Sequence, residues 1–120
     1  MARGLAALNG GPSDYEAAVE AFTQMTAAAP RYAEGWNKRA TAYHLMQRNR
    51  EAIEDCRATL QLNPMHFGAA AGMGMCCAAV KDYPGALAAF QNALEINPRL
   101  GHLRHHIAQL QAIVQDQRGE

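Results

Sequence analysis

Three histidines lie near the end of the chain, at His102, His105 and His106, and they are the residues whose type and spacing are best suited to metal binding or proton transfer. Residues three and four apart are neighbours on a helix surface, so a helical segment would place them on one face. Imidazoles at i and i+4 can chelate Zn²⁺, but there is no HExxH pattern, and no carboxylate or cysteine stands nearby in sequence. We therefore predict no metal site and interpret the histidines as a solvated patch. A further interpretation is that their protonation tunes binding to an acidic partner.

The three cysteines are the other reactive side chains. Cys76 and Cys77 are adjacent, so on a helix they point in different directions, and no CxxC motif exists. Together with Cys56 they are interpreted as buried structural thiols in a reducing compartment. No nucleophile elbow, phosphate-binding loop, dinucleotide fingerprint or pair of catalytic carboxylates is present, and Glu54-Asp55 is interpreted as solvated. We expect no enzymatic activity and no cofactor.

The charge balance narrows the choice of partner. Eleven Lys and Arg residues face 11 Asp and Glu residues, which gives a formal net charge of zero. Nucleic acid and acidic membranes attract a basic excess, so neither is an expected partner. The sequence has no apolar run long enough for a transmembrane helix and no visible signal peptide. We expect an intracellular, reducing location, namely the cytoplasm.

The side chains considered above are set within a repeat of 34 residues. Alanines recur at this step at Ala18, Ala52 and Ala86, and prolines recur at Pro30, Pro64 and Pro98. Residues expected in the core recur at Phe22, Cys56 and Phe90. A period of this length is typical of stacked helical hairpins. The 25 alanines and the small number of β-branched residues favour helices over strands.

Each period predicts two amphipathic helices. The expected ranges are 2–10, 14–28, 33–46, 49–62, 67–80, 83–96 and 101–117. Asp14 and Asp82 are the expected N-caps. Short connections require neighbouring helices to run antiparallel. The last helix has one apolar stripe and polar residues elsewhere, so we expect it to cap the array; the stripe is Leu103, Ile107, Leu110 and Val114.

The repeated positions resemble the tetratricopeptide repeat (TPR) pattern of Trp, Leu, Gly and Tyr followed by Ala, Phe, Ala and Pro. The second repeat carries Trp36, Arg39, Ala40, Tyr43, Ala52, Cys56, Thr59 and Pro64, and the third carries Ala70, Met73, Gly74, Cys77, Ala86, Phe90, Ala93 and Pro98. Arg39, Cys56 and Thr59 depart from the pattern; Arg39 stands where the family has Leu. Gly74 occupies the position of close helix packing.

The resemblance implies an all-α solenoid of antiparallel helix pairs with about seven helices. It implies a single domain over residues 1–120, with repeats at 1–32, 33–66 and 67–100 and a capping helix at 101–118.

In this family the first helices of successive repeats line a concave groove in which ligands bind. Carried over to this sequence, the groove would be lined by Asn37, Lys38, Thr41, His44, Gly68, Ala71, Gly72, Met75, His102 and His106. One subclass grips the C-terminal carboxylate of heat-shock chaperones with Lys, Asn and Arg residues. Here Gly68 and Gly72 replace both basic residues of the third repeat, so we do not expect that mode of binding.

The groove floor of the third repeat is instead nearly bare, and would admit a helix or a large apolar side chain beside Met75. The alternative is an Ala/Gly-rich helix without a ligand. The expected function is a protein–protein interaction adaptor or scaffold that binds a peptide or helix in the groove. A self-associating structural module, assembled as a homo-oligomer through the incomplete first repeat, is the second hypothesis. A metal-dependent activity on the histidine face is the third.

Overall fold

A computed structural model describes residues 12–119, and over this range it contains α-helices and no strand. The helices are α2 (Pro12–Ala28), α3 (Ala33–Leu45), α4 (Asn49–Leu62), α5 (Phe67–Ala79), α6 (Tyr83–Ile96) and α7 (Leu103–Gln117). Their bounds agree with the predicted ranges to within two residues. The predicted helix at 2–10 lies outside the described residues. The all-α solenoid is therefore confirmed, with six helices described where about seven were expected.

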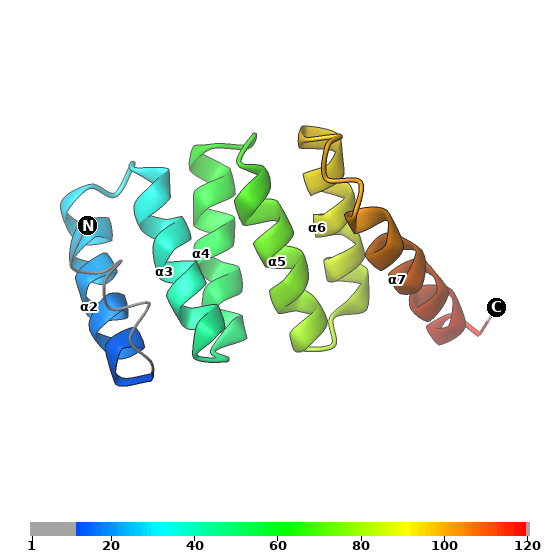
Figure 1. The fold of residues 1–120 in the computed structure, drawn as a ribbon, viewed down its shortest axis with the longest axis horizontal. Helices are drawn as coiled ribbons and strands as arrows, with labels where there is room; N and C mark the ends of the chain where they lie inside the picture. Colours follow the sequence, from blue (N-terminus) through cyan, green and yellow to red (C-terminus); the bar gives the residue numbers. More distant parts are fainter. Residues whose placement is uncertain (1–11, 120) are drawn as a thin grey trace.

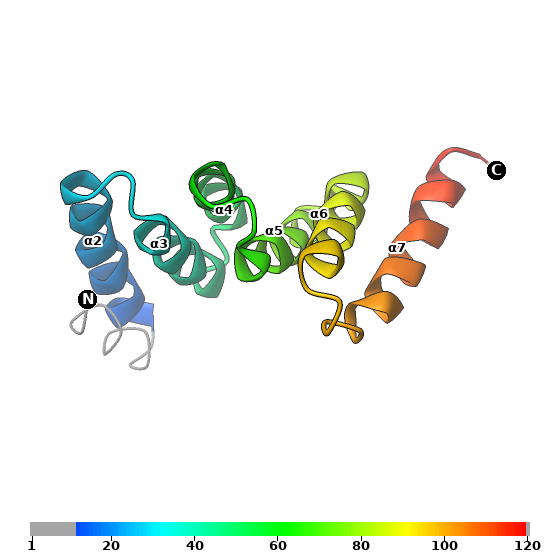
Figure 2. The same ribbon diagram turned by 90° about the horizontal axis from the view of Figure 1, so that it is seen from above.

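The helices lie side by side in chain order, and successive helices run in opposite directions (Figure 1). Each helix packs mainly against its neighbours in the chain. Among helices two apart in the described part of the chain, α3 and α5 have the most extensive contact. The row therefore bends so that α3 and α5 lie on its inner side, with α4 behind them (Figure 2).

The connections α3–α4 and α5–α6 have the same geometry 34 residues apart. Gln47 and Lys81 adopt left-handed backbone angles, with φ of 61° and 66°. The next amide donates to a carbonyl five residues back in both turns, from Arg48 to Tyr43 at 2.8 Å and from Asp82 to Cys77 at 2.9 Å. This is the hydrogen bond of a Schellman helix end. The sequence repeat is thus reproduced in the backbone.

The two predicted N-caps have different outcomes. Asp82 is confirmed, because it precedes α6 and its carboxylate accepts the amide hydrogen of Gly85 at 3.1 Å. The prediction for Asp14 is wrong: α2 begins at Pro12, so Asp14 lies inside the first turn. An acidic residue in the first turn still interacts favourably with the helix dipole.

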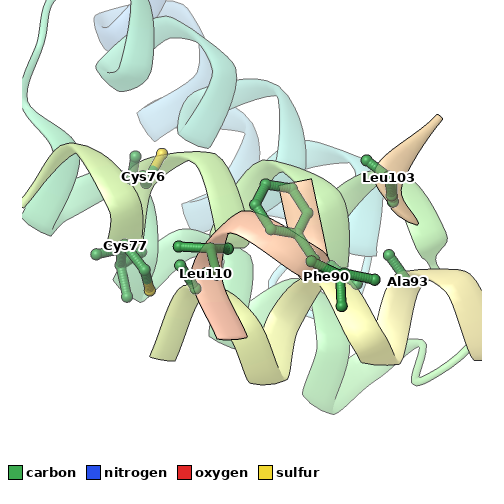
Figure 3. Close-up of a cluster of buried hydrophobic side chains, with 11 residues drawn as sticks. Cys76, Cys77, Phe90, Ala93, Leu103 and Leu110 are labelled. Carbon is green, nitrogen blue, oxygen red and sulfur yellow. The ribbon is translucent and has the colours of Figure 1, made fainter. Parts of the chain in front are cut away.

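The main core runs through α4, α5, α6 and α7 and contains many small residues. It comprises Ala52, Ile53, Ala70, Cys76, Cys77, Ala86, Phe90, Ala93, Leu103, Ile107 and Leu110 (Figure 3). A second cluster joins Ala18 and Phe22 to Ala42. The apolar stripe predicted for the last helix is buried as expected, including Val114.

Gly74 allows α5 and α6 to approach closely. A Cβ atom at this position would lie 2.8 Å from Cδ1 of Phe90, well inside normal contact. The predicted packing role of Gly74 is therefore confirmed.

Candidate functional site

A hollow of about 220 Å³ lies between the two inner helices and is called here the α3–α5 hollow. Its lining comprises Asn37, Ala40, Thr41, His44, Cys56, Gly68, Gly72, Met75 and Cys76. Gly72 forms open floor, because a Cβ atom there would meet only Sγ of Cys56, at 3.9 Å. On the α5 side the hollow is open because Gly68 and Gly72 contribute no side chain to its lining.

The imidazole of His44 is held at the side of this hollow. Its Nδ1 lies 2.8 Å from Oδ1 of Asn49, the first residue of α4, and 3.4 Å from Sγ of Cys76 on α5. His44 is therefore in contact with both neighbouring helices, and its orientation is fixed by them.

A second and larger hollow, of about 600 Å³, separates α5 from α7 and is called the α5–α7 pocket. It is lined by Ala71, Met75 and Ala78 of α5, Phe90 of α6, and His102, Leu103, His106, Gln109, Leu110 and Ile113 at and within α7. Phe90, Leu103 and Leu110 belong to the buried core (Figure 3), so the base of the pocket is apolar. The ring of His106 stacks on Phe90 at a centroid distance of 5.8 Å.

The structure places nine of the ten predicted groove residues in the linings of these two hollows. Those lining the α3–α5 hollow are Asn37, Thr41, His44, Gly68, Gly72 and Met75. Those lining the α5–α7 pocket are Ala71, Met75, His102 and His106. Met75, half exposed at 52%, belongs to both, and Lys38 lines neither.

Ile113 and Phe90 are site residues that the sequence reasoning missed. A signal for Ile113 was present, because His102, His106, Gln109 and Ile113 follow steps of four, three and four along one helix face. Phe90 gave no such signal, because it also occupies a core position of the repeat.

Asp55 corrects the expectation that Glu54-Asp55 is solvated. Asp55 is only 3% exposed, and its two carboxylate oxygens accept hydrogen bonds from Nε and Nη2 of Arg39, both at 2.8 Å. Arg39 also donates to Oγ1 of Thr23 at 3.3 Å and lies over the Trp36 ring. Glu54 is exposed as expected. The unusual arginine of the second repeat therefore ties α3 to α4 and α2 behind the hollow.

His66 connects the starts of the two inner helices. Its Nδ1 accepts the amide hydrogen of Ala69 at 3.0 Å and caps α5. The proton therefore resides on Nε2, which donates to the carboxylate of Glu34 at the start of α3. This contact fixes α3 and α5 relative to each other at one end of the α3–α5 hollow.

The cysteines are buried and weakly acidic, as expected for structural thiols. Burial raises the pKa of Cys56 to about 12 and that of Cys76 to about 11, and it also raises the pKa of Cys77. No group of three or more His, Cys, Asp or Glu side chains within residues 12–119 is arranged to hold a metal ion.

We expect the folded protein to react very slowly with Ellman's reagent at about pH 8, because only the thiolate attacks the disulfide. For Cys76 a pKa of about 11 leaves on the order of one thiolate in a thousand at that pH. The rate should rise about tenfold per pH unit as long as the fold persists. In denaturant all three thiols should react within the mixing time. Rapid modification of one thiol in the folded protein would contradict the burial described here.

Neither hollow presents a Lys, Arg, Asp or Glu side chain in its lining. The polar groups available to a ligand are imidazoles, amides and one hydroxyl, and the rest of both surfaces is apolar or glycine. No described helix is both long enough and apolar enough to cross a membrane. Such a surface suits an apolar or weakly polar ligand better than an isolated charged one.

A sequence model of the tetratricopeptide repeat family matches residues 33–66, the residues that the sequence period assigns to the second repeat. A TPR repeat-containing protein of Rhizobium etli is 34% identical over 82 residues, which are 68% of this chain and 40% of that relative. The chain thus spans less than half of the relative's length.

Solved structures of TPR domains have the same fold. The TPR2B domain of yeast Sti1, solved in complex with pHsp70, is 28% identical with a TM-score of 0.79 and covers 96% of this chain and 92% of its own. The second TPR domain of human RPAP3, solved with the HSP70 peptide SGPTIEEVD, is 25% identical with a TM-score of 0.83. The match covers 91% of this chain and 89% of the RPAP3 domain. Residues 33–66 are therefore a tetratricopeptide repeat, and the described helices have the fold of solved TPR domains.

Proposed function

We propose that this chain is a protein-interaction adaptor that binds a peptide or helical segment of a partner protein along its concave side. The observation that carries the proposal is the sharing of Met75 by the α3–α5 hollow and the α5–α7 pocket. Two hollows joined at one exposed, adaptable side chain form a track for a continuous segment rather than a single small-molecule cavity. In this proposal the chain acts by binding and not by catalysis.

The relatives solved with HSP70 peptides support a peptide ligand, but the lining residues here favour a different one. The peptide bound by human RPAP3 ends in Glu-Glu-Val-Asp. Several charged groups at a peptide end require charge-assisted donors such as Lys or Arg. Gly68 and Gly72 supply none on α5, and Lys38 lies outside both hollows. We therefore propose that apolar contacts, rather than a carboxylate clamp, hold the partner.

We also propose that the chain forms one domain. Its division would be repeats 1–32, 33–66 and 67–100 with a capping helix at 101–118. The turns after α4 and α6 match, since the amide of His66 donates to the carbonyl of Asn63 and that of Leu100 to the carbonyl of Asn97, both at 3.1 Å, and they support the boundaries at residues 66 and 100.

Gly72 offers a matched test of the groove. The immobilised chain is used to select binders from a phage-displayed library of random peptides of about 12 residues, and an enriched peptide is then measured by fluorescence anisotropy. Gly72→Arg would fill the floor of the α3–α5 hollow, so we expect affinity to fall about 30-fold or more. Gly72→Ala adds a methyl group into open space, so it should bind like the wild type.

Circular dichroism of both variants controls for folding. Unchanged affinity of a folded Gly72→Arg variant would contradict the placement of the ligand in the groove. Failure to enrich any peptide on the wild-type chain would contradict peptide binding itself.

A further inference from the structure

The α5–α7 pocket arises from an unequal packing of the last helix. One stripe of α7 is buried against the core, whereas the parallel stripe of His106, Gln109 and Ile113 faces the pocket. Across from it, α5 contributes Ala71 and Ala78, whose methyl groups are too short to fill the space. The pocket is thus an apolar cavity about three times as large as the α3–α5 hollow, with volumes of about 600 and 220 Å³.

The base of the pocket is suited to a large apolar side chain. Phe90 is 5% exposed and its ring is stacked under His106, so an entering side chain would contact aromatic faces and the side chains of Leu103 and Leu110. Ile113, 38% exposed, is the apolar residue of α7 that remains open beside it. Filling a pocket of this kind with an aromatic or long aliphatic group is the usual arrangement of an interface anchor.

The mouth of the pocket carries histidines without compensating carboxylates. His102 and His106 line the pocket, and the His105 ring lies 6.0 Å from that of His106. Among the described elements that enclose the pocket, α5 has no charged residue, and the only charged residue of α6, Glu95, lines a different hollow with Ile107. Arg104 and Asp116 of α7, Tyr83 of α6 and the cysteines of α5 are absent from the pocket lining. Imidazole is the side chain that most readily gains a positive charge near neutral pH, so these rings are the groups of the mouth with which a carboxylate can pair.

Building on the proposed function, we propose that the α5–α7 pocket is the anchor subsite for a large apolar side chain flanked by an Asp or Glu residue on the partner segment. The apolar side chain occupies the pocket beside the stacked rings of Phe90 and His106, and the flanking carboxylate lies against the imidazoles of His102, His105 and His106. Binding of such a segment therefore strengthens in mild acid. The chemistry of the partner is an acidic amphipathic peptide or helix rather than a free peptide C-terminus.

Peptides selected from the random library on the wild-type chain at about pH 6.2 test this assignment. We expect enriched sequences to pair an aromatic or long aliphatic residue with a nearby Asp or Glu. Replacing the apolar residue with Ala should weaken binding about tenfold or more. Replacing the acidic residue with its amide should remove the gain of several fold that is expected between about pH 7.5 and 6.2.

Two substitutions on α7 provide the matched protein variants. Ile113→Glu places a carboxylate at the pocket, and we expect it to reduce affinity about tenfold or more. Gln111→Glu introduces the same charge at an exposed position outside the pocket, with no histidine three or four residues away, and should change affinity less than about twofold. The triple variant His102→Gln, His105→Gln, His106→Phe keeps an aromatic ring over Phe90. We expect its affinity to be the same at about pH 7.5 and 6.2, whereas that of the wild type rises several fold over this range.

The outcomes separate this inference from the proposed function. Enriched peptides that are lost on Gly72→Arg but bind equally to Ile113→Glu and wild type would overturn the anchor subsite and leave the adaptor function standing. Enriched peptides without acidic residues, or with pH-independent affinity, would overturn the role of the histidines. An absence of enriched peptides would overturn the proposed function and this inference together.

Discussion

Replacing Arg39 with Leu is expected to destabilise the protein by about 3 kcal/mol, although Leu is the residue typical of TPR sequences at this position. The reason is Asp55, whose carboxylate would remain buried without the two hydrogen bonds at 2.8 Å that it accepts from the guanidinium. An unpaired buried charge costs more than the pair itself contributes. Arg39 is partly exposed, with 16% of its side chain accessible, so we place the expected loss at the lower end of the usual range.

The double variant Arg39→Leu, Asp55→Leu is the decisive control. Exchanging a buried ion pair for two apolar side chains is often neutral, so we expect the double variant to lie within about 1 kcal/mol of the wild type. Urea unfolding followed by circular dichroism gives the free energies of unfolding. If the double variant is as unstable as Arg39→Leu alone, the loss comes from packing around Trp36 or Thr23 and not from the stranded carboxylate.

Replacing Phe90 with Ala is expected to destabilise the protein by about 3–5 kcal/mol, since the ring is almost fully buried between α5, α6 and α7. The same ring determines the effect of Gly74. Gly74→Ala should destabilise the wild type by about 1 kcal/mol. The new Cβ would lie 2.8 Å from the Phe90 ring, and the resulting steric strain exceeds the stabilisation that the higher helix propensity of Ala provides.

The two positions should be strongly coupled. Removing the Phe90 ring removes the three atoms nearest to the added methyl group at position 74, so Gly74→Ala should stabilise the Phe90→Ala background by about 1 kcal/mol. A double-mutant cycle measured by urea unfolding would show this change of sign as a coupling energy. Additive effects would contradict the close approach of α5 and α6 at Gly74.

Much of the fold was predictable because the 34-residue period repeats both the prolines that end helices and the small and large residues of the core. The recurring alanines and prolines restrict helix length and contact distance in each hairpin, so the helix bounds and the packing role of Gly74 followed from local chemistry. Asp14 was wrongly predicted as an N-cap because an acidic residue is favourable both before a helix and within its first turn. Proline is favoured at the first helical position, and the helix begins at Pro12.

The site was less predictable, because its shape depends on angles between helices. The family resemblance indicated which residues face the inner side, but not that α7 packs on the core by one stripe and leaves the α5–α7 pocket open along the other. The burial of Asp55 was missed because its partner is 16 residues away, where Arg39 breaks the family pattern. Long-range pairs of this kind have no local sequence signature.

The measurement that tests the central claim most directly is an NMR titration of the isotopically labelled chain with a peptide enriched on the wild type. If the concave side is the binding surface, the largest amide shift changes should fall on Gly68, Gly72 and Met75 of α5 and extend to Ile113 of α7. Changes concentrated instead at the separate polar hollow around Arg50, Arg57 and Lys81 would contradict the account. They would place the interaction surface outside the groove.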